Sequence, residues 1–184
     1  MMKRFSILTL GCKVNQYESQ QIRQLIERFG LTHVHVTESP DLVVVNTCCV
    51  THTASAKSRQ FLRQARRQQP TAVVICGCLP RVTTDDLTVT GKNVHVVKDP
   101  RDLASTLSLL VGHPSTTPNP EHPRLSNHSD IRAETEPKVK PKNDLGAPLE
   151  LQPLARFQDH TRAFLKVQDG CDAFCTYCII PKTR

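Results

Sequence analysis

The chain has 184 residues, a formal net charge of +7 and eight cysteines. The length suffices for one ordinary domain with additional segments. The apolar run from Phe5 to Leu10 is too short for an export signal and ends without a cleavage site, and no stretch approaches the ~18 apolar residues that a bilayer span requires. We therefore expect a cytoplasmic chain with no membrane segment, whose thiols serve metal or redox chemistry. The positive charge favours an anionic partner, nucleic acid first.

The first segment, residues 4–10, predicts a buried strand that leads into a loop containing Cys12. A helix should follow, because Asn15 and Glu18 have the spacing of a capping box and Gly30 ends the helical pattern. Apolar residues recur at helical spacing in between: Ile22, Leu25, Ile26 and Phe29.

A short alternating piece, residues 33–36, precedes the continuous apolar run 42–45, which is typical of a parallel strand covered on both faces. A second helix is expected over residues 53–68. One of its faces is the core face, and the other is basic. The core face contains Ala54, Ser58, Phe61, Leu62 and Ala65. The basic face is solvated by default, with an RNA backbone contact as the alternative. Its arginines are Arg59, Arg63, Arg66 and Arg67.

A third buried strand is predicted over residues 72–76 and a further one over 94–97. A helix should open at Asp99 and run to about Val111. Strands that alternate with helices indicate an α/β fold with an open parallel sheet and right-handed crossovers.

Cys12, Cys48 and Cys78 each follow the carboxyl end of a predicted strand. Ligands bind at that edge of open α/β sheets, so we expect these three thiols to meet at one crevice. A lone cysteine is more often a small buried hydrophobe, which is our interpretation of Cys76. Cys49 stays ambiguous, because adjacent residues at a strand end point to opposite sides and Cys48 already takes the ligand role.

The composition changes from residue 113 to about 150, where more than half of the thirteen prolines fall. This segment has few large apolar residues and should be a flexible linker. Its histidines lie in no periodic context, so we expect no metal site among them: His113, His122 and His128. A strand is predicted over residues 162–167.

Three further cysteines follow that strand with the spacing C-x3-C-x2-C: Cys171, Cys175 and Cys178. Three thiolates can hold a four-iron cluster by three of its corners and leave the fourth iron open. An open metal position is typical of catalytic rather than structural sites. A zinc knuckle or an electron-transfer cluster remains the alternative for this spacing.

Together these motifs resemble the methylthiotransferase family of radical S-adenosylmethionine (SAM) enzymes. The matching stretches are Thr9–Ser19, Asn46–Cys48, Gly77-Cys78 and Arg162–Pro181. The resemblance implies that Cys12, Cys48 and Cys78 hold an auxiliary [4Fe-4S] cluster and that Cys171, Cys175 and Cys178 hold the [4Fe-4S] cluster that binds SAM. It assigns no catalytic side chain. Cys49 and the stretch Leu79-Pro80-Arg81 depart from the usual family pattern without removing a ligand.

Within the family, residues 11–18 most resemble the branch that modifies N6-threonylcarbamoyladenosine at position 37 of tRNA. The branches that act on isopentenyladenosine or on a ribosomal protein are the alternatives. The resemblance implies that a flavodoxin or ferredoxin supplies an electron, that SAM yields a 5′-deoxyadenosyl radical, and that a methylthio group is added to C2 of the adenine. The partner would be the tRNA anticodon loop, whose unpaired bases can be splayed into a site.

The expected organisation is an N-terminal α/β domain over residues 1–112, a linker over 113–150, and the start of a TIM-barrel-like radical SAM domain over 151–184. The chain is therefore expected to be a fragment that is inactive alone. Two other functions fit the cysteines and charge: a non-enzymatic iron–sulfur electron carrier and a zinc-stabilised RNA-binding module.

Overall fold

The fold is an open α/β sheet of five parallel strands, seen in a computed structural model that describes residues 2–82, 91, 93–112, 151–154, 164–173 and 175–183. This confirms the predicted fold class. The strand order is β2-β1-β3-β4-β5. The strands are β1 (Arg4–Thr9), β2 (Thr32–His33), β3 (Leu42–Thr47), β4 (Ala72–Gly77) and β5 (Val94–Val96).

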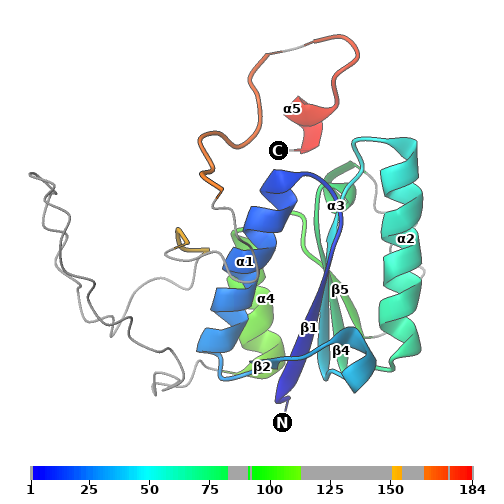
Figure 1. Ribbon diagram of the computed structural model, residues 1–184, viewed down its shortest axis with the longest axis vertical. Helices are drawn as coiled ribbons and strands as arrows, with labels where there is room; N and C mark the ends of the chain where they lie inside the picture. Colours follow the sequence, from blue (N-terminus) through cyan, green and yellow to red (C-terminus); the bar gives the residue numbers. More distant parts are fainter. Residues whose placement is uncertain are drawn as a thin grey trace, which may run out of the picture.

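Helices cover both faces of the sheet, with α1 and α4 on one face and α2 on the other (Figure 1). This layering buries the apolar strands on both sides, as parallel sheets require. The short α3 and α5 lie beyond the carboxyl ends of the strands. The helices are α1 (Lys13–Arg28), α2 (His52–Arg67), α3 (Leu79–Val82), α4 (Asp102–Val111) and α5 (Ile180–Thr183), with a 3-10 turn η1 (Val36–Glu38).

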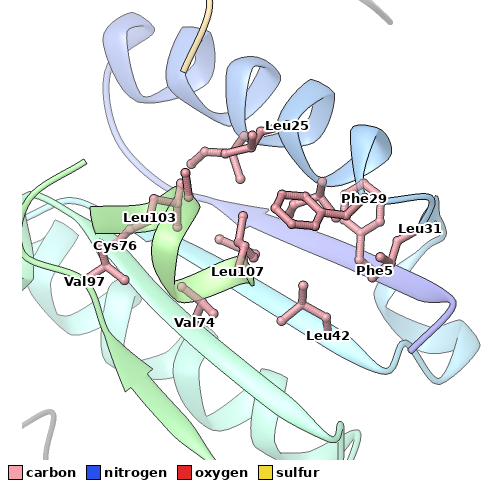
Figure 2. Close-up of a cluster of buried hydrophobic side chains, with 14 of the residues drawn as sticks. Phe5, Leu25, Phe29, Leu31, Leu42, Val74, Cys76, Val97, Leu103 and Leu107 are labelled. Carbon is pink, nitrogen blue, oxygen red and sulfur yellow. The ribbon is translucent and has the colours of Figure 1, made fainter. Parts of the chain in front are cut away.

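The sheet separates two apolar cores, because alternate residues of each strand point to opposite faces. Leu42 and Val44 of β3 pack under α1 and α4, whereas Val43 and Val45 pack under α2. Figure 2 shows the first core, in which Cys76 lies beside Leu103 and Val97. Cys76 is 6% exposed, which agrees with the predicted packing role.

The predicted capping box at Asn15 is wrong. Helix α1 begins at Lys13, and its N-cap is Cys12, three residues before Asn15, with no side-chain capping bond. Asn15 lies inside the first turn and is fully buried, because its amide is engaged with the end of β3. Tertiary hydrogen bonds have here replaced the local cap that the spacing indicated.

Other boundaries differ by small amounts. Helix α2 begins one residue earlier than predicted, since the Thr51 hydroxyl accepts a hydrogen bond from the Ala54 amide. Helix α4 begins at Asp102 rather than at Asp99. The alternating piece gives only the two-residue β2, because the chain turns into η1 at Val36.

The strand predicted over residues 162–167 is not formed in its described part. Residues 164–167 make no strand, and Leu165 and Val167 are 86% and 85% exposed. A β-strand requires a paired neighbour, and none of the described residues offers one here. The predicted linker, 113–150, lies outside the described residues, so the domain boundaries stay predictions.

Candidate metal centre at the carboxyl edge of the sheet

The loops that carry Cys12, Cys48 and Cys78 lie side by side, because β1, β3 and β4 are neighbours in the sheet. The Leu10 amide donates to the Asn46 carbonyl at 2.9 Å, and the Cys78 amide donates to the Thr47 carbonyl at 3.0 Å. Loops that are 30 or more residues apart in sequence therefore meet at one edge, as their place after the strand ends indicated. The meeting of the three thiols themselves stays a prediction.

Two buried asparagines join the start of α1 to the end of β3. Asn15 Nδ2 donates to the Thr47 carbonyl at 2.8 Å and to Asn46 Oδ1 at 3.3 Å. Asn46 Nδ2 donates in turn to the Asn15 carbonyl and to Ser19 Oγ, both at 3.0 Å. The segment that carries Cys12 is thus fixed to the strand that leads to Cys48. The Cys12 thiol itself donates to Asn15 Oδ1 at 3.3 Å.

The backbone of Cys48 is held by Ser58 of α2. The Cys48 amide donates to Ser58 Oγ at 3.1 Å, and the Ser58 hydroxyl donates to the Cys48 carbonyl at 2.9 Å. Ser58 is 1% exposed, so this pair of bonds is protected from water. Sequence reasoning placed Ser58 only on the core face of the helix. The one signal for its role was a polar residue on an otherwise apolar face.

Gly77 brings β4 into close contact with β3 immediately before Cys78. Its φ is +91°, a region that other residues rarely adopt. A Cβ at this position would lie 2.4 Å from the Thr47 carbonyl oxygen and 2.5 Å from Asn46 Oδ1. Glycine is therefore required here for the approach of the two cysteine loops.

The three thiols differ in exposure. Cys12 is exposed, whereas Cys48 and Cys78 are 4% and 2% exposed, and none of the three forms a disulfide bond. Cys49 is also buried and belongs to the same apolar cluster as Cys78. Within the described ranges, no group of three His, Cys, Asp or Glu side chains is arranged to hold a metal ion. The ligand assignment therefore stays a prediction, although thiols on three neighbouring loops suit the thiolate ligation of iron–sulfur clusters.

The second cysteine loop reaches the same edge of the sheet. Cys171 and Cys178 are half-buried and Cys175 is exposed, and the Cys178 amide donates to the Cys175 carbonyl at 3.1 Å. Ile179 packs against the apolar cluster that contains Cys49 and Cys78. The residue after Cys178 thus contacts the neighbourhood of the first cysteine set, and Figure 1 shows α5 above the strand ends.

Arg81 of α3 links the two loops by hydrogen bonds. Its Nη1 donates to the Thr183 carbonyl at 3.0 Å, and its Nε donates to the Lys98 carbonyl at 2.9 Å. Thr183 is 1% exposed at this contact. Because Arg81 lies one turn after Cys78, a single side chain connects the end of β4 with the segment that follows Cys178.

Three further contacts bind the C-terminal segments to α1. Leu154 donates its amide to the Tyr17 hydroxyl at 3.3 Å, and Gln21 donates to the Gln152 carbonyl at 2.8 Å. The Lys13 ammonium lies 4.6 Å from the centre of the Phe164 ring, a cation–π contact beside Cys12.

The nearest perturbed carboxyl group is Asp99, after β5. Hydrogen bonds from the side chain and the amide of Arg101 lower the pKa of Asp99 to about 2, and Arg81 adds a smaller lowering. Asp99 therefore carries a full negative charge at neutral pH. This charge interacts with the guanidinium groups of Arg101 and Arg81.

The fold and the placement of the loops define an open parallel α/β domain that gathers cysteine-bearing segments at the carboxyl edge of its sheet. No described helix combines the length and the apolar character that crossing a bilayer demands. The chain belongs to the family described as "Uncharacterized protein family UPF0004", whose model matches residues 4–98.

Curated relatives match over nearly the whole chain. A threonylcarbamoyladenosine tRNA methylthiotransferase MtaB of Bacillus subtilis (strain 168) is 34% identical over 96% of this chain, and one of Chlamydia pneumoniae is 34% identical over 98%. A tRNA-2-methylthio-N(6)-dimethylallyladenosine synthase of Neorickettsia sennetsu is 27% identical over the full chain. The chain spans 35% of the length of the first two relatives and 37% of the third.

Proposed function

We propose that the chain forms the α/β domain and the SAM-cluster loop of a radical SAM methylthiotransferase that modifies tRNA. The observation that carries this proposal is the contact, at one edge of the sheet, between the segments that contain the two cysteine sets. Ile179 packs against the cluster containing Cys78, and Arg81 joins the two segments by a hydrogen bond. A reaction that uses two iron–sulfur clusters on one substrate needs such proximity.

Cys12, Cys48 and Cys78 would hold the auxiliary cluster, and Cys171, Cys175 and Cys178 the cluster that binds SAM. When bound, these groups supply one-electron and sulfur-transfer chemistry that no side chain provides. The chain's own residues position the thiols. Asn15 and Asn46 fix the Cys12 loop to β3, and Ser58 fixes the backbone of Cys48. A flavodoxin or ferredoxin would supply the electron.

The proposed substrate is N6-threonylcarbamoyladenosine at position 37 of tRNA. Two relatives at 34% identity are named for this nucleoside. The sequence of residues 11–18 favours the same branch of the family. The dimethylallyladenosine (isopentenyladenosine) substrate is the alternative, because relatives at 27–28% identity are named for it.

Anaerobic reconstitution with iron and sulfide, followed by metal analysis, tests the proposal. We expect the wild-type chain to hold two clusters' worth of iron, and alanine at residues 12, 48 and 78 together to remove half of it. Alanine at residues 171, 175 and 178 should remove the other half and abolish the change that SAM causes in the spectrum of the reduced cluster. Cys76→Ala is the matched control and should keep all the iron, because that thiol lies in the apolar core.

The rival functions give different results. A zinc-stabilised module would give colourless protein with stoichiometric zinc, and a plain electron carrier would show no spectral response to SAM. An unchanged iron content after loss of Cys12, Cys48 and Cys78 would refute the auxiliary site.

A further inference from the structure

Helix α2 has a charge composition unlike that of α1. It carries five basic residues and no acidic residue over sixteen positions, whereas α1 mixes both signs and pairs Arg23 with Glu27 at 3.0 Å. The basic residues of α2 are Lys57, Arg59, Arg63, Arg66 and Arg67. Except for the half-buried Arg59, all are exposed. We call the four arginines of this set the α2 basic face, because Lys57 lies on another side of the helix.

The α2 basic face concentrates like charges on one side of the helix. At 100° per residue, the four arginines fall within about 100° of the helix circumference. Arg63 stands three residues from Arg66 and four from both Arg59 and Arg67, spacings at which like charges repel. Among the residues that the structure describes, the side chains of Lys57, Arg63, Arg66 and Arg67 form no ion pair. Helix α2 itself contains no acidic residue that would relieve this repulsion.

The position of α2 connects this charge with the cysteine edge. The helix starts at His52, four residues after Cys48, and runs back along the sheet on the face opposite α1 (Figure 1). The positions from Arg59 to Arg67 cover about 12 Å of helix axis. That length matches several consecutive phosphates of a nucleic acid strand.

We propose that the α2 basic face binds the phosphate backbone of the tRNA anticodon stem while the loop reaches the cysteine edge. The inference rests on the proposed function for its choice of RNA. The partner is a polyanion with a regular backbone, because the charges form a stripe along a rigid helix. The α2 basic face contains no aromatic side chain that could stack on bases. The contact is therefore electrostatic and independent of sequence.

Replacement of Arg63 by Glu tests the contact, with Arg28→Glu as the matched control. Both residues are exposed on helices and both substitutions change the charge by the same amount, but Arg28 lies at the end of α1 on the other face of the sheet. Binding of a synthetic anticodon stem–loop RNA is measured by fluorescence anisotropy over a range of salt concentrations. We expect Arg63→Glu to weaken binding about five- to eightfold at 0.1 M salt and to reduce the salt slope by about one. Arg28→Glu should change both by much less.

Thermal stability separates a binding role from a structural one. Arg63→Glu turns three repulsive spacings into attractive ones, so its melting temperature should rise while its RNA affinity falls. Equal losses of affinity in the two variants, or no binding of RNA by the wild-type chain, would overturn the proposal. The iron content of the same preparations reports on the proposed function separately, since neither arginine lies near a cysteine in sequence.

Discussion

The close approach of β4 to β3 makes Gly77→Ala the most informative single substitution. The added methyl would lie 2.4 Å from the Thr47 carbonyl oxygen, whereas such contacts are rarely shorter than 3.0 Å. The ends of the two strands would have to separate by more than half an ångström. This movement strains the bond from the Cys78 amide to the Thr47 carbonyl and the bond from the Thr47 hydroxyl to the Cys76 carbonyl.

The expected cost follows from two contributions. The positive φ of Gly77 costs an alanine about 1–2 kcal/mol, and loss of one or two buried hydrogen bonds adds about 1–3 kcal/mol. The sum of about 2–5 kcal/mol is a large share of the stability of an ordinary domain. For a domain near 100 residues it lowers the melting temperature by roughly 10 °C or more.

Urea unfolding and iron reconstitution measure the two consequences of Gly77→Ala. Gly112→Ala is the matched control, because its φ is +97° but a Cβ there meets nothing within 4 Å. We expect Gly112→Ala to lower the free energy of unfolding only by the cost of the positive φ, and the variant should keep its iron. Equal loss of stability in the two variants, with iron retained in both, would refute the steric argument.

Two other substitutions test separate contacts. Arg81→Ala should release the Thr183 carbonyl and speed the alkylation of Cys178 by a thiol reagent, with little change in melting temperature. Arg101→Ala is the control, since its surface ion pair with Asp99 forms no hydrogen bond with the described part of the C-terminal segment. An unchanged alkylation rate in Arg81→Ala would count against the link. Asp41→Asn tests a pH effect. Hydrogen bonds from the amides of Lys3 and Arg4 lower the pKa of the Asp41 carboxyl group in the folded chain below its ordinary value of 3.8. The carboxylate therefore stabilises the fold fully above about pH 4, and this stabilisation is lost as the pH falls through the folded pKa. The variant should be less stable than wild type at pH 7 by urea unfolding, and the difference should shrink toward pH 2; a difference that stays constant with pH would contradict this reasoning.

The sheet could be predicted from sequence because its strands are continuous apolar runs. Residues 42–47 and 72–76 are buried on both faces, which only a central parallel strand explains. The placement of Cys12, Cys48 and Cys78 at the strand ends followed from the same reasoning. The pattern of apolar residues was sufficient for both predictions, because it indicates which residues are buried and where each strand ends.

The polar framework under the cysteine loops could not be predicted, because it depends on contacts between distant segments. The spacing of Asn15 and Glu18 indicated a local cap, but the Asn15 amide bonds residues of β3 more than 30 positions away. The clamp of Ser58 on Cys48 depends likewise on how α2 packs against the end of β3. In both places the conformation is determined by tertiary hydrogen bonds and not by local sequence propensity.

The apolar core and the candidate metal centre are determined by one property, the register of the central strands. Thr9 pairs with Asn46, and Asn46 with Cys76. The three candidate ligands come two or three residues later at the same height of the sheet. A slip of one residue would turn the buried face of a strand to the other side and would also displace its thiol from the other two. The burial that stabilises β3 and β4 thus fixes the relative positions of Cys48 and Cys78 before any metal is bound.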